Sequence, residues 1–154
     1  MVTPSGWHED ALRRDAGHDA MHLAVWRFHS IPDSYGSWTR DVHFEWPVLA
    51  LRGGIRAFAD IAEIYWSGAP PPGRSYKQWV RVYLYEIKPT VSTVGGIVRQ
   101  CAALEAAATP YVRRLNGRVE LSVMPVIPHD NGMLRELLEV IDCYRWDKDA
   151  GRLL

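Results

Sequence analysis

Hydrophobic positions fall into four strand-like runs, separated by segments with helical spacing or turn residues. These runs are rich in valine, isoleucine, tyrosine and tryptophan, the residue types that suit a pleated and half-buried surface. Glycine and proline clusters separate them and act as breaks. The four predicted strands span residues 42–51, 55–66, 78–88 and 118–127.

The segments between the strands carry helix signals. Met21, Val25 and Phe28 recur at helical spacing and predict a helix within Trp7–His29, broken at Gly17. The third strand is followed by Ser92 and Thr93, residue types that cap helices, so a helix is expected over 94–108. Pro110 should end or kink this helix, and a kinked helix would continue over Tyr111–Leu115. A short helix over 132–140 and a small edge strand over 141–146 complete the predicted elements.

The predicted order is αβββαβ, with a further helix and a small strand behind it. Three consecutive strands can form an antiparallel meander, and the helix before the fourth strand makes a crossover connection. The sequence therefore predicts an α/β (α+β) fold with a mixed central sheet flanked by helices. At 154 residues, a single domain over 1–154 is expected.

Composition limits the classes of protein to which the chain can belong. No apolar run approaches the roughly 20 residues that a membrane-spanning helix needs, and no signal-peptide pattern is present, so a cytoplasmic protein without a membrane partner is expected. Cys101 and Cys143 are expected as core thiols. A formal net charge of zero argues mildly against broad non-specific binding of nucleic acid, although a local basic face stays open.

The candidate chemistry lies at the end of the third strand. Glu86 and Lys88 are two residues apart, so they share one face of a strand. Asp60 sits in the apolar second strand, where a carboxylate is costly to bury without a cation or a hydrogen-bond partner. If these strands pair, Asp60 and Glu86 converge. Two carboxylates, a backbone carbonyl and waters suit Mg²⁺. An acid and a lysine at this spacing also occur by chance in many strands.

The segment Tyr85–Gln100, with Glu-Ile-Lys followed by a glycine-containing helix start and Arg-Gln, resembles the PD-(D/E)xK nuclease superfamily, which has the restriction-endonuclease-like fold. The resemblance covers about residues 18–147. It implies an αβββαβ core with an acid on the second strand and an acid-x-lysine on the third, positions that Asp60, Glu86 and Lys88 match.

The resemblance implies a metal-dependent nuclease acting on DNA. Asp60, Glu86 and the backbone carbonyl of Ile87 are then the expected ligands of Mg²⁺ or Mn²⁺, and Lys88 is expected to assist the attacking water. Gln100 is implied as an auxiliary catalytic residue and Arg99 as a phosphate contact. A homodimer or a larger complex is the expected route to specificity.

Some positions depart from the family pattern. Ala59 precedes Asp60 where the family often has proline. The Pro32-Asp33 pair matches the first two letters of the motif, but it lies in a predicted turn before the first strand and is rejected as a site. Relatives with the helix glutamine often carry tyrosine four residues later, where this chain has Leu104. These differences bear on the subfamily and leave the expected metal site unchanged.

Three further acids are candidates for an auxiliary role. The first helix of the family often supplies another acid, and Glu9 and Asp19 are the residues available for it. Glu45 on the first strand could support the site from the neighbouring strand, although a solvent-facing acid is the more ordinary interpretation.

Two alternatives stay open. The first is a non-catalytic nucleic-acid-binding or assembly module that keeps a nuclease-like fold, which the neutral charge favours slightly. The second is an enzyme of another class that binds Zn²⁺ through His18 and His22, which lie four residues apart on one helical face. The metalloprotease motif has a glutamate beside its first histidine, which this chain lacks, so a surface pair is the preferred interpretation.

Overall fold

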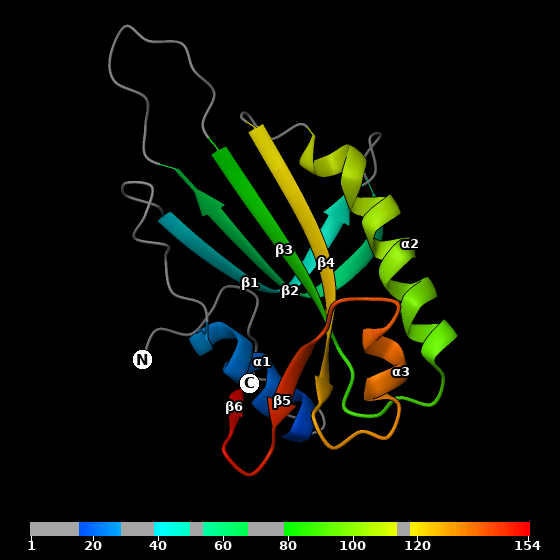
Figure 1. Cartoon of the computed structure of the whole chain (residues 1–154). Helices are drawn as coiled ribbons and strands as arrows, with labels where there is room; N and C mark the ends of the chain where they lie inside the picture. Colours follow the sequence, from blue (N-terminus) through cyan, green and yellow to red (C-terminus); the bar gives the residue numbers. More distant parts are fainter. Residues whose placement is uncertain (1–15, 29–38, 50–53, 68–78, 114–117) are drawn as a thin grey trace, which may run out of the picture.

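The computed structural model describes residues 16–28, 39–49, 54–67, 79–113 and 118–154. These residues form three helices and one sheet of six strands (Figure 1). In chain order the elements are α1 (Ala16–Phe28), β1 (Thr39–Leu49), β2 (Ile55–Trp66), β3 (Trp79–Ile87), α2 (Val94–Val112), β4 (Arg118–Pro128), α3 (Leu134–Leu138), β5 (Tyr144–Asp147) and β6 (Arg152–Leu153).

The sheet is mixed, and its strands lie side by side in chain order from β1 to β6. The first three strands form an antiparallel meander. From β3 the chain crosses over through α2 and returns as β4, which is parallel to β3. β5 is parallel to β4, and β6 closes the sheet antiparallel to β5. The four predicted strands, the meander, the crossover helix and the α+β class are therefore confirmed.

The C-terminal end of the sheet differs from the prediction. The segment expected as an edge strand forms β5 only over Tyr144–Asp147, and β6 lies outside it. A tight turn joins the two strands: the carboxylate of Asp147 accepts hydrogen bonds from the N–H groups of Asp149 and Ala150, and Gly151 adopts a φ of 64°. A strand of two residues is too short for its alternation to be read from the sequence.

The crossover helix α2 begins where the sequence predicts but runs further. The Thr93 hydroxyl accepts a hydrogen bond from the Gly96 N–H and caps the first turn. A Cβ at position 96 would lie 2.6 Å from the Thr93 hydroxyl oxygen, so glycine permits this cap. Pro110 does not end the helix at residue 108, and the continuation past the proline, which the sequence left open, reaches Val112. No helix in the described part of the chain is long and apolar enough to cross a membrane.

The two long helices pack against opposite faces of the sheet. Met21 and Val25 of α1 belong to one core cluster together with Ile61 and Tyr85. The residues that alternate with these on the strands face α2, where another cluster is centred on Leu104. A further cluster joins α2, α3 and the end of β4 and includes both cysteines, Cys101 buried and Cys143 partly buried. Burial raises the pKa of the Cys101 thiol to about 12, as fits a core position.

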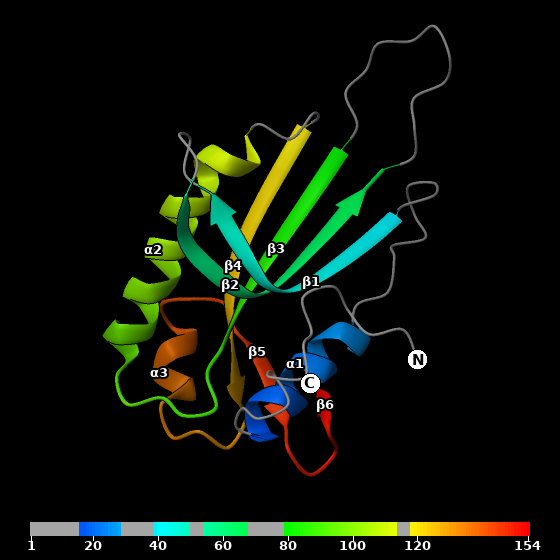
Figure 2. The same cartoon turned by 180° about the vertical axis from the view of Figure 1, so that it is seen from behind.

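The β1–β2 hairpin bends midway along its length (Figures 1 and 2). At the bend Glu45 has a φ of 51°, a left-handed conformation that is uncommon for residues other than glycine. The register on either side places Glu45 opposite Asp60, between the pairs Phe44–Ile61 and Trp46–Ala59. Beyond the bend the hairpin packs on α2, where the Trp46 ring meets Tyr111 edge-on at 5.1 Å between centroids.

The conformation of Glu45 can be tested by substitution. We expect Glu45→Val to lower the free energy of unfolding by about 1–2 kcal/mol, because a β-branched side chain fits the left-handed region poorly. Glu45→Gly should stay within about 1 kcal/mol of the wild type, because glycine adopts this conformation freely. Urea denaturation of the purified variants measures both values.

The matched control is Asp41→Val, at an exposed position on the same strand that lacks a positive φ. It should be neutral or slightly stabilising, since valine favours strands. Equal losses in Glu45→Val and Asp41→Val would show that the bend does not depend on a left-handed residue.

Candidate functional site

The site lies where β2 and β3 separate. Their last backbone pair joins Ile61 to Tyr85, so Asp60 and Glu86 are the first residues beyond the paired region. From this point β3 continues alongside β4. The Ile87 N–H donates a hydrogen bond to Asp60 Oδ2 at 2.7 Å. The side-chain oxygen of Asp60 thus accepts the bond that a backbone carbonyl of β2 would accept in a continued strand pair. This arrangement fixes the Asp60 carboxylate beside the end of β3.

Glu86 is almost fully buried, with 7% of its surface exposed, and polar groups surround its carboxylate. The Gln100 side-chain amide donates to Glu86 Oε2 at 3.3 Å. The Lys88 ammonium lies 3.7 Å from the same oxygen. Glu86 lies on β3, Lys88 follows directly after its last residue, and the second turn of α2 supplies Gln100. The structure thus brings together Asp60, Glu86, Lys88 and Gln100, the four residues predicted as catalytic.

Electrostatics favour protonation of Glu86 when no cation is present. Burial raises the pKa of this carboxyl to about 7, and the neighbouring Asp60 carboxylate adds to the increase, while Lys88 acts in the opposite direction. Two carboxylates this close repel each other unless a proton or a cation lies between them. The oxygen-rich surroundings therefore fit a divalent cation.

The other residues of the predicted site lie nearby. Ile87, whose carbonyl is the third expected metal ligand, contacts Asp60 through its N–H. Arg99 precedes Gln100 on α2 and is exposed to solvent. Its guanidinium lies beside Gly95 in the first turn, since a Cβ at that glycine would be 3.1 Å from Nη1 of Arg99. The Arg99 side chain is therefore an exposed charged group at the start of α2.

The three acids predicted as auxiliary residues differ in where they lie in the structure. Glu45 is partly buried and lies close to Asp60, so its interpretation as a simple solvent-facing acid is wrong. Asp19 lies on α1, but the placement of its side chain is outside the described structure. Glu9 lies outside the described residues altogether, as does the rejected Pro32-Asp33 pair.

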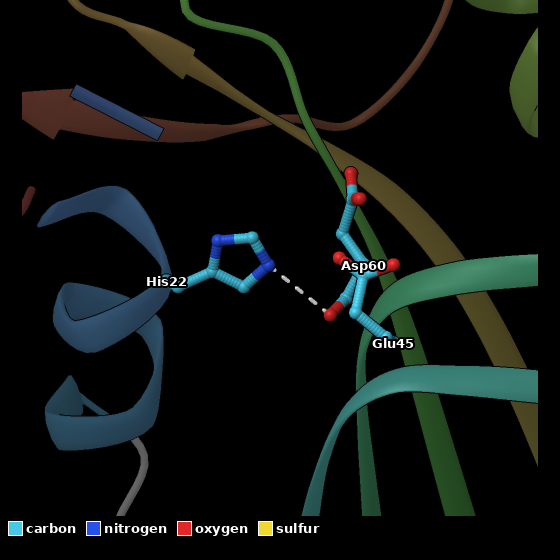
Figure 3. A group of neighbouring side chains, drawn as sticks. All are labelled: His22, Glu45 and Asp60. Carbon is cyan, nitrogen blue, oxygen red and sulfur yellow. Dashed lines mark hydrogen bonds between the residues drawn. The ribbon is translucent and has the colours of Figure 1, made fainter. Parts of the chain in front are cut away.

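His22 is a site residue that the sequence analysis missed. Its interpretation as half of a surface pair with His18 is wrong, because only 1% of its surface is exposed. The His22 ring reaches from α1 to the site, where Nε2 lies 3.2 Å from the backbone carbonyl oxygen of Asp60 (Figure 3). The available signal was its position next to Met21 on the buried stripe of the helix.

A second acid on β2, Glu63, shows by contrast what a structural carboxylate looks like. Glu63 is completely buried, and its Oε2 accepts hydrogen bonds from Arg40 Nε at 2.9 Å and from the Tyr65 hydroxyl at 2.8 Å. Burial raises its pKa, and Arg40 counteracts this. A carboxylate held by an arginine inside the core has little capacity for a metal ion, unlike Asp60 and Glu86.

No protein-family model, curated protein or solved structure matches the chain.

The raised pKa of Glu86 predicts a pH dependence of stability in the metal-free protein. Between about pH 4.5 and 7 the folded state holds the Glu86 proton and the unfolded state releases it. The free energy of unfolding should therefore fall as pH rises through this range, by about 2–3 kcal/mol from this group. Glu86→Gln should lack this contribution. Urea denaturation in EDTA across the range gives the difference between variant and wild type.

The control is Glu105→Gln, at an exposed position on α2. This variant keeps the buried Glu86, so its free energy of unfolding should still fall as pH rises through this range. A constant difference between Glu86→Gln and the wild type would contradict the raised pKa.

Proposed function

We propose that the protein is a metal-dependent nuclease of the PD-(D/E)xK type that hydrolyses phosphodiester bonds in DNA. The observation that carries this proposal is the meeting of two carboxylates and a lysine at the point where β2 leaves β3. Asp60 is fixed by the Ile87 N–H, and Lys88 lies 3.7 Å from Glu86 Oε2.

The order of the elements supports the same proposal. A helix, an antiparallel three-strand meander, a crossover helix and a parallel fourth strand follow one another. The acid of the second strand and the Glu-x-Lys of the third occupy the positions that the resemblance implies. A restriction-endonuclease-like core is therefore the finer fold assignment that we infer.

The roles of the residues follow from their positions. Asp60 and Glu86, with the Ile87 carbonyl, would hold Mg²⁺ or Mn²⁺. When bound, such an ion lowers the pKa of water and offsets charge on the phosphate. Lys88 lies beside the carboxylates, where it would orient the attacking water and stabilise the charge that develops on the phosphate. Gln100 contacts Glu86 and acts as a positioning residue.

The DNA partner is inferred from the phosphate chemistry. Arg99 places a positive charge beside the site, on a chain whose formal net charge is zero. Binding would then depend on local contacts instead of a broad basic surface. A homodimer or a larger complex would supply the specificity that one small domain does not encode.

The non-catalytic alternative keeps the same fold without hydrolysis. In such a module nothing requires a buried Glu86 to sit near a second carboxylate and a lysine, an arrangement that costs stability. The zinc alternative built on His18 and His22 has no support from the described residues, because His22 points into the protein toward Asp60.

Cleavage assays test the proposal. Duplex, single-stranded and branched DNA are incubated with the full chain and Mg²⁺ or Mn²⁺, and the products are separated on gels. We expect metal-dependent cleavage of at least one substrate. Lys88→Ala and Asp60→Asn should reduce the rate by at least 100-fold, because each removes a group that acts directly on the reaction.

The matched control is Lys148→Ala, at an exposed lysine on the β5–β6 turn, which should cleave like the wild type. Equal cleavage by wild type and Lys88→Ala would assign the activity to a contaminant or to another site. No cleavage by a folded wild type on any of the substrates would favour the non-catalytic module.

Gln100 and Arg99 are neighbours with separable roles. Gln100→Ala should lower the cleavage rate about tenfold and raise the metal concentration needed for half-maximal activity, because the orientation of Glu86 is lost. Arg99→Ala should instead raise KM and weaken the salt dependence of binding, since it removes a phosphate contact. Rates measured against metal, DNA and salt concentration separate the two. Identical profiles for both variants would contradict these roles.

A further inference from the structure

A second group of potential metal ligands surrounds Asp60. His22 from α1, Glu45 from the bend of β1 and Asp60 from β2 each offer a ligand atom, and these atoms lie within 4.8 Å of one another. The His22 ring points toward the two acids on the adjacent strands (Figure 3). The three residues come from three different elements, and their convergence depends on the tertiary fold.

The spacing of the three ligand atoms is close to that of an occupied site. Nitrogen and oxygen ligands lie about 2.0–2.2 Å from a bound Zn²⁺, so two of them can be up to about 4.2 Å apart. Ligand atoms within 4.8 Å of one another therefore reach a single ion after movements of less than about 1 Å. Rotation of the Glu45 and Asp60 side chains about their own bonds provides movements of this size.

This group differs in chemistry from the one around Glu86. The group around Glu86 offers carboxylate oxygens from Glu86 and Asp60 and no imidazole, and oxygens are the ligands that a hard cation takes. The His22 group contains an imidazole. Imidazole suits Zn²⁺, Cu²⁺, Fe²⁺ and Ni²⁺, whereas Mg²⁺, Ca²⁺ and Mn²⁺ take oxygen ligands.

We propose that His22, Glu45 and Asp60 form a second cation site, which shares Asp60 with the Glu86 site and selects transition ions over Mg²⁺. Asp60 can serve both sites because a carboxylate has two oxygens, one of which, Oδ2, accepts the Ile87 N–H. The site exists whether or not the protein cleaves DNA.

Ion binding has a defined consequence for the proton on His22. Nε2 lies 3.2 Å from the Asp60 carbonyl oxygen, which can only accept, so Nε2 carries a proton in this arrangement. An ion bound at Nε2 takes the place of that proton. A neutral ring then keeps its single proton on Nδ1, and a charged ring releases one proton to solvent. The tautomer of His22 therefore reports occupancy independently of any activity.

The test titrates the metal-free, ¹⁵N-labelled full chain with Zn²⁺ and, separately, with Mg²⁺. Long-range ¹H–¹⁵N spectra report the His22 ring nitrogens, and calorimetry gives the affinity. We expect Zn²⁺ to move the proton signature of His22 from Nε2 to Nδ1, and Mg²⁺ to leave it unchanged. Glu45→Gln, which keeps the size of the side chain, should weaken Zn²⁺ binding at least tenfold.

His129→Gln, at an exposed histidine just after β4, is the matched control and should bind Zn²⁺ like the wild type. Unchanged His22 nitrogens at saturating Zn²⁺ would overturn the proposal, as would wild-type affinity in Glu45→Gln. Joint shifts of His18 and His22 that are insensitive to Glu45→Gln would assign the ion to the histidine pair instead.

The outcomes also separate this site from the proposed function. Zn²⁺ binding with the expected signatures but no DNA cleavage would support the cation site and contradict the nuclease. Mg²⁺-dependent cleavage without any response of His22 to Zn²⁺ would support the nuclease and contradict the cation site.

Discussion

The site depends on one hydrogen bond, from the Ile87 N–H to Asp60 Oδ2. Ile87 is buried, and a buried N–H without an acceptor costs about 1–3 kcal/mol. In a continued antiparallel pair a β2 carbonyl would accept it. Here the aspartate side chain does so, which allows β2 to leave β3 without loss of the bond. The same hydrogen bond holds the Asp60 carboxylate where the two strands separate. It therefore contributes both to the separation of the strands and to the geometry of the site.

The point where β2 separates from β3 places the carboxyl groups of Asp60 and Glu86 close together, which the fold alone would not favour. Glu86 lies beneath α2 with a second carboxylate nearby, and its raised pKa expresses the strain of that arrangement. Lys88 and Gln100 relieve it only in part, since each contacts the same oxygen, Oε2. Glu63 lies three residues from Asp60 along β2, where an ion pair with Arg40 offsets part of the cost of its burial. One half of β2 thus holds an acid paired with an arginine, and the other half holds an acid beside a second carboxylate.

Much of the sheet could be predicted from residue pattern. The boundaries of β2 agree with the predicted 55–66 run, because a β-rich segment lies between glycines and a proline-rich loop. Glu86 and Lys88 fall on one face because strand periodicity is strictly local. Their approach to Asp60 required only that consecutive strands pair. Each of these predictions depends only on elements that are neighbours in the sequence.

What the pattern could not provide is contact between distant elements. His22 looks like one member of a polar helical pair until α1 is placed on the sheet, 38 residues away from Asp60 in sequence. The identity of Glu45 does not predict its left-handed backbone, because the bend of the hairpin requires that conformation and glutamate as a residue type does not favour it. Pro110 lies within α2, and the adjacent Tyr111 packs on Trp46 of β1, a contact between distant elements that the local pattern does not show.

The mixed topology gives the site an order of assembly. The contact that holds the paired acids joins residues 27 apart in sequence, on successive strands of the meander. The docking of α1, and with it the imidazole, joins residues 38 apart, and the entropic cost of closing a loop rises slowly with its length. A chain in which the meander has formed but α1 has not docked would hold its paired acids without the imidazole of the proposed cation site. Its ligands would then be oxygens alone, so the proposed preference for transition ions depends on the docking of α1.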